Sequence, residues 1–425
     1  MKLGKTILLS AIIVSFILAP SFRYAGAASE YTEPLSIILM IGDGMGYEHV
    51  KMARWVEVGK DANLTLETLP YAFSVETYSA SDEITDSAAA ATAMATGVKT
   101  DNGMLSIAPN GTELQTILEM AQSNGKATGL VTTTPIQHAT PAGFMIHSTS
   151  RDDYPYISQQ IVENSGVDVL MGGGSELFSS QQIDFMVAKG YSFADDKTTL
   201  GAINSDMILG LFAASNMDYE QDRDINLTPS LAEMTDKALG TLSQDQEGFF
   251  LMVEGGRIDH AGHDFNKVND ALETIEFDKA VAVALDFVQA HSNTILIVTA
   301  DHETGGLMIT GDSLSGDLPS DENTELENRA IRIARANSIN VTYTAGYHTD
   351  SNVPLFIYGD VFEQYAIDDV IDNTQIFDIM DDYYSGRIGS QVAQLPITVE
   401  MIAIIAGTGV IIVLVAYLIR LRRSS

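Results

Sequence analysis

Short apolar runs alternate with polar and alanine-rich segments along most of this chain. Several runs have the length and continuous apolar character of strands buried on both faces of a sheet: 35–41, 249–253, 294–300 and 353–359. Another strand-and-turn signal, 167–174, lies within the stretch 152–200. Because such runs alternate with helical patterns, the sequence predicts an α/β fold with a mostly parallel central sheet and helices on both faces.

Residues of the types that bind metals stand at the ends of these predicted strands. The glycine-rich turn after the first run contains Asp43, the third run is followed by Asp301 and His302, and His348 stands shortly before the fourth. Carboxylates and imidazoles are zinc ligands, and open α/β sheets build their sites at strand ends. The first turn alone is also compatible with an ordinary glycine-rich turn. Four such strand ends together predict a site for several metal ions.

The segment after the second run has the highest density of candidate ligands: Glu254, Asp259, His260, His263 and Asp264. Asp259 and His263 are four residues apart, so on a helical turn they lie on one side and can bind the same ion. The alternative is a solvated acidic loop with two surface histidines. Because the whole chain has only eight histidines, their concentration here favours a metal site.

The alanine-rich stretch 85–97 predicts a helix that carries a candidate nucleophile. Thr85 or Asp86 can cap its start, and Gly97 is suited to end it. Ser87 then lies in the first turn, where free backbone N–H groups and the helix dipole favour an anion. A lone serine in this position is usually an ordinary capping residue. Beside a metal cluster it becomes a candidate nucleophile, because zinc can deprotonate a hydroxyl that has no histidine base.

Six motifs, taken together, resemble those of the alkaline phosphatase family, in the same order and spacing over about 34–359. They are Ile41–Gly46, Thr85–Ala89, Gln137–Ala142, Glu254–His263, Thr299–Glu303 and His348–Thr349. The resemblance implies hydrolysis of small phosphate monoesters, with Ser87 as the nucleophile that becomes phosphoserine. It also implies that Arg151 binds the substrate phosphate, and that the protein is a homodimer.

The resemblance further implies three metal ions. One zinc ion would be bound by Asp259, His263 and His348, and a second by Asp43, Asp301 and His302. A magnesium-type site would be formed by Asp43, Thr140 and Glu254, with Asp43 shared between the second and third sites. The ligand chemistry agrees with this division, because imidazole suits zinc, whereas a set made only of oxygen atoms suits magnesium.

Two histidines depart from the best-known bacterial pattern of the family. His138 and His260 stand where that pattern has an aspartate and a lysine, whereas animal-type and many other members have histidine at both positions. Two imidazoles near the third site can attract zinc or cobalt in place of magnesium. Alternatively, both histidines only support that site through hydrogen bonds. The sequence leaves both interpretations open.

Other functions compete with a phosphomonoesterase. One is a member of the same superfamily that acts on diesters, sulfates or phosphonates. Ser87 lacks the Cys/Ser-x-Pro-x-Arg context of sulfatases, and Arg151 favours a dianionic monoester. Another is an inactive surface protein that uses its metal sites for stability. That interpretation is disfavoured, because neither the nucleophile nor any zinc ligand is missing.

Both ends of the chain have the character of membrane-targeting segments. Residues 1–28 combine early lysines, an apolar stretch and small residues for cleavage, as in a signal peptide. The uncharged apolar run 401–419 is long enough to cross a bilayer, and the basic tail 420–425 would stay in the cytoplasm. A GPI signal is the rival interpretation of this end. With a catalytic domain at 31–384 and a stalk at 385–400, the sequence predicts an enzyme anchored at the cell surface.

Composition sets limits on the extracytoplasmic part. Without residues 1–28 and 401–425, the chain has 57 acidic and 17 basic residues, a formal charge of −40 with neutral histidines. Such a surface repels nucleic-acid backbones, so no nucleic-acid binding is expected. The chain has no cysteine, so the fold must hold without disulfides. The acidic stretch Ser313–Asn328 indicates a surface insertion between the segments that carry Asp301 and His348.

Overall fold

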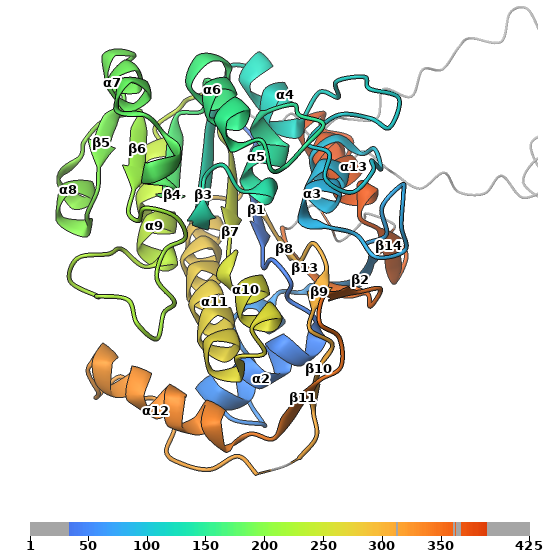
Figure 1. Ribbon diagram of the computed structural model, residues 1–425, viewed down its shortest axis with the longest axis vertical. Helices are drawn as coiled ribbons and strands as arrows, with labels where there is room; N and C mark the ends of the chain where they lie inside the picture. The colour runs from blue at the N-terminus through green and yellow to red at the C-terminus, as the bar shows by residue number, and fades with distance from the viewer. Residues whose placement is uncertain (1–33, 312, 360–361, 363–366, 389–425) are drawn as a thin grey trace, which may run out of the picture. The chain divides into compact units, whose positions relative to one another are not determined.

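The computed structural model describes residues 34–311, 313–359, 362 and 367–388, and its described part is built on a ten-stranded sheet (Figure 1). In spatial order the strands are β14 (Val370–Asp372), β2 (Tyr71–Glu76), β13 (Val353–Tyr358), β8 (Thr294–Thr299), β1 (Ser36–Ile41), β7 (Phe249–Glu254), β3 (Ala127–Pro135), β4 (Val169–Gly173), β6 (Ile208–Leu211) and β5 (Ser192–Ala194). The predicted α/β fold with a mostly parallel sheet is confirmed.

One strand of this sheet, β13, runs against its neighbours. It pairs antiparallel with both β8 and β2, whereas the other strand pairs of the described sheet are parallel. The amino end of β13 therefore lies at the edge where the parallel strands have their carboxyl ends. This reversal explains why His348 precedes β13 in the sequence, whereas Asp43 follows β1 and Asp301 follows β8.

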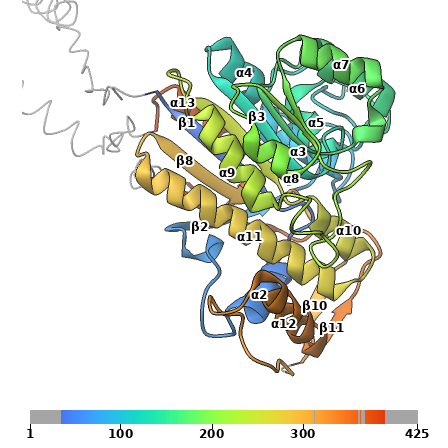
Figure 2. The same cartoon turned by 90° about the vertical axis from the view of Figure 1, so that its left-hand side faces the viewer.

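The three central strands form the middle of the hydrophobic core. Every residue of β1, β7 and β8 is buried, as expected for parallel strands covered on both faces. Helices α9 (Leu231–Leu242) and α11 (Lys267–Ala290) pack on one face, and α4 (Ile117–Ser123) and α5 (Ala139–Met145) pack on the other (Figure 2). This enclosure gives the strand ends a rigid support.

Further helices surround these layers. They are α2 (Tyr47–Glu57), α3 (Ser87–Thr96), α6 (Tyr154–Asn164), α7 (Ser180–Ala188), α8 (Lys197–Ala202), α10 (Arg257–His263), α12 (Glu325–Ser338) and α13 (Thr374–Tyr384). Two small antiparallel pairs complete the described elements: β10 (Leu307–Ile309) with β11 (Val341–Tyr343), and β9 (Glu303–Thr304) with β12 (His348–Thr349). The pair β9–β12 brings the segment after β8 to the segment before β13.

The predicted surface insertion contains more regular structure than its acidic sequence indicated. The side chain of Thr324 caps α12, so this helix begins inside the range 313–328. The buried guanidinium of Arg335 donates to the backbone oxygens of Trp55 and Val56 at 2.6 and 2.7 Å. Those oxygens belong to the last turn of α2, where helix carbonyls lack intrahelical partners. Helix α12 thus holds the end of α2, the helix that follows the Asp43 turn.

The predicted targeting segments, 1–28, 401–419 and 420–425, lie outside the described residues. Within the described residues, which all belong to the compact unit Tyr31–Ile388, no helix has both the length and the apolar character of a membrane span. The first residues of the predicted stalk, 385–388, are described, and Ile388 is buried in the core.

Candidate active site and metal centre

The ends of β1, β7 and β8 and the start of β12 bring the predicted ligands to one edge of the sheet. Glu254 is the last residue of β7, and the backbone of Ile41 at the end of β1 pairs with it. His348 in β12 lies opposite Thr304 in β9. Gly44 makes this convergence possible. Its φ is 77°, and a Cβ atom added at this position would lie 2.8 Å from Asp259 Cα, so no residue with a side chain fits there.

Ser87 lies at the start of α3, as predicted, and is 1% exposed. Asp86 caps the helix by accepting a hydrogen bond from the Ala89 N–H at 3.0 Å. The Ser87 Oγ lies 3.2 Å from His302 Nε2. The helix start therefore places the hydroxyl beside a predicted zinc ligand and leaves backbone N–H groups near an incoming anion.

The first predicted zinc ligands are close to one another. His263 Nε2 lies 3.3 Å from Asp259 Oδ1 and 3.3 Å from His348 Nε2, and His348 Nε2 lies 3.5 Å from Asp259 Oδ1. Asp259 and His263 share one side of α10, as their spacing predicted. His348 Nδ1 is bonded to the Thr85 carbonyl at 2.8 Å, which leaves Nε2 as the nitrogen that can bind an ion.

The second predicted zinc ligands are fully or almost fully buried. His302 Nε2 lies 3.2 Å from Asp301 Oδ2 and 3.5 Å from Asp43 Oδ1. The other oxygen of Asp301 accepts hydrogen bonds from the backbone N–H groups of Gly44 and His302 at 3.0 and 2.9 Å. Both oxygens of Asp43 and Oδ2 of Asp301 have no hydrogen-bond partner among the described residues.

The third predicted site is built around Glu254. Its Oε2 accepts hydrogen bonds from the hydroxyls of Thr132 and Thr134 on β3, the latter at 3.1 Å. Its Oε1 has no hydrogen-bond partner among the described residues, and neither has the buried Thr140 hydroxyl. His138 Nδ1 lies 3.7 Å from Glu254 Oε1. Threonines of a neighbouring strand thus hold one oxygen and leave the other available.

Potential ligand atoms gather in three buried groups within the described residues, each with atoms within 4.8 Å of one another. They are Asp43–Asp301–His302, Asp259–His302–His348 and Asp43–His138–Glu254. The first of these is the predicted second zinc site. The other two contain His302 and His138 in addition to predicted ligands, and His263 also lies 3.3 Å from Asp259 Oδ1 and from His348 Nε2.

The electrostatics of these clusters require positive charge. Burial, together with nearby Asp301, raises the pKa of Asp43 well above its ordinary value. Burial likewise raises the pKa of Asp301 to about 7. Burial lowers the pKa of His302 well below its usual value, and the charge of His348 adds to this effect. A neutral His302 and carboxylate oxygens without hydrogen-bond partners, as in Asp43 and Asp301, are the state that divalent cations stabilise. The residues present therefore fit bound metal ions.

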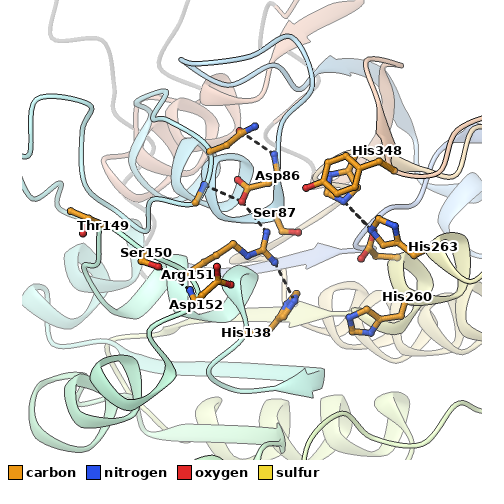
Figure 3. A pocket seen from close by; sticks show the side chains of 14 residues that line it. Asp86, Ser87, His138, Thr149, Ser150, Arg151, Asp152, His260, His263 and His348 are labelled. Atoms are coloured by element: carbon orange, nitrogen blue, oxygen red, sulfur yellow. Dashed lines mark hydrogen bonds and ion pairs between the residues drawn. The ribbon is translucent and has the colours of Figure 1, made fainter.

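Arg151 and His138 meet beside Ser87 (Figure 3). Arg151 Nη1 donates to Asp86 Oδ2 at 3.0 Å, and Nη2 lies 3.3 Å from His138 Nε2. A guanidinium only donates, so His138 Nε2 is the acceptor and a neutral His138 carries its proton on Nδ1. Arg257 Nη1 in the same way donates to His260 Nδ1 at 3.1 Å.

A cavity of about 690 Å³ opens above these groups. Its lining includes Ser87, Arg151, His138, His260, His263 and His348, so residues from distant parts of the chain share one site. Figure 3 shows Arg151 and His138 on one side of Ser87, and His348 and His263 on the other. Asp43, Thr140, Glu254, Asp301 and His302 are buried close by and are not part of this lining.

Sequence reasoning missed several supporting residues. The Thr304 hydroxyl donates to Asp259 Oδ1 at 2.6 Å and lies 3.2 Å from His302 Nδ1. Asp86 was expected only as a helix cap, but it also holds Arg151. Tyr347 lines the cavity. The pairing of Thr304 with His348 depends on β9–β12, and no local pattern in the sequence indicated those two short strands.

A model of the family described as alkaline phosphatase matches residues 35–334. Alkaline phosphatase 3 of Bacillus subtilis is 32% identical over 445 residues, which cover 88% of this chain and 95% of that protein. A cold-active alkaline phosphatase from Shewanella has a similar crystal structure, with a TM-score of 0.71, 31% identity, and coverage of 82% of this chain and 99% of that one.

A further solved structure is that of a relative with bound magnesium. It is a variant of the alkaline phosphatase from the Antarctic bacterium TAB5, with a histidine replaced by glutamate and magnesium bound in its M3 site. This structure has a TM-score of 0.69 and 28% identity, and covers 83% of this chain and 98% of that one. The family model spans most of the described residues, and the Bacillus relative matches nearly end to end. This chain therefore belongs to the alkaline phosphatase family and is a phosphoric monoester hydrolase.

Proposed function

We propose that this enzyme hydrolyses phosphate monoesters in two steps through a phosphoserine at Ser87. In the first step, Ser87 Oγ forms a bond to phosphorus while the bond to the leaving alkoxide breaks. In the second, a water oxygen bonds to phosphorus and the serine oxygen leaves, which releases inorganic phosphate. The observation that carries this proposal is the position of Ser87 Oγ, buried at the start of α3 and 3.2 Å from His302 Nε2.

The chain's own residues suit each part of this reaction. The start of α3 offers backbone N–H groups to the phosphate. Arg151 is oriented by Asp86 and has a planar fork that can bind two phosphate oxygens. We assign one zinc ion to Asp259, His263 and His348 and a second to Asp43, Asp301 and His302. Bound there, zinc would supply the charge that lowers the pKa of a hydroxyl and stabilises a leaving oxygen.

We assign the third site to magnesium, with Asp43, Thr140 and Glu254 as ligands. The hydrogen bond from Arg151 to His138 Nε2 supports this assignment, because it leaves a proton on Nδ1, the nitrogen nearest Glu254. In that tautomer His138 is a donor and not a ligand. The remaining ligands are all oxygen atoms, which magnesium prefers.

The experiment that tests the reaction is an assay of the zinc- and magnesium-loaded protein with p-nitrophenyl phosphate and with bis-p-nitrophenyl phosphate. We expect rapid hydrolysis of the monoester, loss of activity on chelation, and recovery when zinc and magnesium return. Ser87→Ala should abolish labelling of the protein by ³²P-phosphate and lower turnover by roughly 10³-fold or more. Faster hydrolysis of the diester would support the phosphodiesterase alternative, and a labelled Ser87→Ala variant would exclude the covalent mechanism.

We also propose that the enzyme works outside the cytoplasm, held at the membrane by its C-terminal segment. The proposal is supported by the signal-like sequence 1–28, the uncharged run 401–419 and the basic residues after it. The homodimer that the family resemblance implies is a proposal of the same standing. Sedimentation of the soluble catalytic part would distinguish a monomer from a dimer.

A further inference from the structure

The lining of the active-site cavity contains one phenol ring. Among the described residues that form the cavity, Tyr347 is the only aromatic residue that is not a histidine. It is 54% exposed, whereas Ser87 and His348 are buried at 1% and 4%. Polar groups cover most of the remaining lining. Tyr347 is therefore the part of the wall best able to contact an apolar or aromatic portion of a substrate.

Tyr347 forms the outer end of a stack of rings that begins beside the nucleophile. The rings of His302 and His348 have centroids 3.5 Å apart at an interplanar angle of 16°. Those of His348 and Tyr347 are 4.1 Å apart at 11°. Two rings cannot occupy the same face of an imidazole at these distances, so His348 lies between the other two. Tyr347 is also 5.5 Å from the ring of His263.

The direction of the proposed displacement places the leaving group on the side of Tyr347. Ser87 Oγ contacts His302, a member of the second ligand cluster. An in-line reaction expels its leaving group opposite the attacking oxygen. We expect that side to be the first ligand cluster, where His263 and His348 lie and where Tyr347 stacks, because His302 belongs to the second cluster.

We propose that Tyr347 binds the leaving group and makes this phosphatase selective for monoesters whose leaving group is a planar aromatic ring. This inference rests on the proposed in-line attack by Ser87. Aromatic rings attract one another beyond simple burial of area, by an amount that corresponds to about two- to tenfold in affinity. A small aliphatic leaving group offers no ring and gains little from this contact.

The test uses the full-length, zinc- and magnesium-loaded enzyme and two inhibitors that are not hydrolysed, phenylphosphonate and methylphosphonate. Both carry the same phosphonate, so the ratio of their inhibition constants reports the organic group alone. We expect the wild type to bind phenylphosphonate at least about threefold more tightly. Tyr347→Leu should bring the ratio close to one, whereas Tyr347→Phe should preserve it. Tyr156→Leu, a change at a similarly exposed tyrosine on α6, is the matched control and should leave the ratio unchanged.

Specific outcomes would overturn the proposal. An equal affinity of the wild type for both inhibitors would exclude an aromatic leaving-group site, whatever the variants do. If Tyr347→Leu loses zinc and weakens both inhibitors alike, Tyr347 only holds His348. The proposed reaction is judged separately, by Ser87-dependent hydrolysis of p-nitrophenyl phosphate in the wild type. Normal turnover with no aromatic preference therefore rejects the role of Tyr347 and leaves the role of Ser87 intact.

Discussion

At the scale of single residues, several side chains of the site have one polar atom held by a hydrogen bond and a second polar atom available to bind an ion. His348 has its Nδ1 bonded to the Thr85 carbonyl, so only Nε2 is available. Asp301 has one oxygen held by backbone N–H groups and one without a partner among the described residues. Glu254 likewise has one oxygen held by the hydroxyls of Thr132 and Thr134 and one without a partner among the described residues. Such constraints orient ligands before an ion binds, which reduces the entropy lost on binding.

The guanidinium of Arg151 is expected to contribute most of the side-chain affinity for phosphate. Arg151→Ala should raise the inhibition constant of inorganic phosphate by about 10- to 100-fold, because two charge-assisted hydrogen bonds are lost. Arg151→Lys should recover only part of this, since an ammonium group lacks the planar fork. Arg387→Ala, at an exposed arginine near the C-terminal end of the described residues, serves as control. An unchanged inhibition constant in Arg151→Ala would contradict the assignment.

The two histidines near the third site are expected to set its metal preference. In His138→Asp, a carboxylate replaces an imidazole that now accepts from Arg151. The added oxygen donor should tighten magnesium binding at the third site relative to zinc and cobalt. Adding His260→Lys places a fixed positive charge nearby, so phosphate should bind more tightly and leave more slowly. The double variant should have lower maximal turnover and a less alkaline optimum.

The measurement is a pH–rate profile of each metal-depleted protein after addition of magnesium, zinc or cobalt. If the double variant matches its parent in metal response and pH optimum, His138 and His260 have no influence on the third ion.

At the scale of elements, local patterns in the sequence were sufficient where one segment carries its own signal. The runs at 35–41, 249–253 and 294–300 became β1, β7 and β8, and the alanine-rich helix begins and ends as predicted. Contacts between distant segments were not predictable. The reversal of β13 and the short pair β9–β12 follow from tertiary pairing, which leaves no periodic pattern in a single segment. Helix α12 does carry a local signal, the capping box of Thr324 and Glu327, although its acidic start was interpreted as a surface insertion.

The residues of the site also divide into those that a local motif predicts and those whose roles depend on tertiary contacts. The motifs located every carboxylate and histidine of the clusters, because each stands beside a strand end or on one helical turn. Thr304 and Tyr347 carry no such signal, since their roles depend on the position of His348.

The contact between α4 and the segment after α5 should make stability depend on pH. His147 Nε2 lies 3.0 Å from Glu119 Oε1 in the first turn of α4. This hydrogen bond is the main cause that raises the pKa of His147. Burial opposes ionisation of Glu119, but bonds from His147 and the Thr116 N–H lower its pKa overall.

The pH dependence of the stability follows from the raised pKa of His147 and the lowered pKa of Glu119. A raised pKa of His147 contributes stability that is complete below about pH 6.5 and is lost as pH rises through its folded-state pKa. A lowered pKa of Glu119 contributes stability above about pH 4.3 that is lost as pH falls further. His147→Gln should therefore cost most free energy of unfolding between these values, about 1 kcal/mol or less for this partly exposed pair. Urea unfolding at pH 5.5 and pH 8.5 measures it, and an equal cost at both would refute the prediction.

At the scale of the whole molecule, a strongly acidic chain without cysteine must hold a site that is itself rich in carboxylates. Its stability rests on the buried core. The ligand clusters at the edge of the sheet would add to that stability when they hold cations. Ions that bind only the folded state stabilise it by mass action, so metal supply and folding are linked. An oxidising environment cannot stabilise this chain through disulfides, because it has no cysteine.

The predicted membrane anchor should be separable from catalysis. Truncation after Gln391 retains the core residue Ile388 and removes 392–425, so the shortened enzyme should be released in soluble form with unchanged kcat/KM. Full-length enzyme should remain in the membrane pellet after a carbonate wash. Ile412→Arg, a charge in the middle of the run 401–419, should weaken retention, because it costs about 3 kcal/mol at a bilayer centre. Full-length protein in the supernatant with residues 401–425 intact would show that 401–419 is not an anchor.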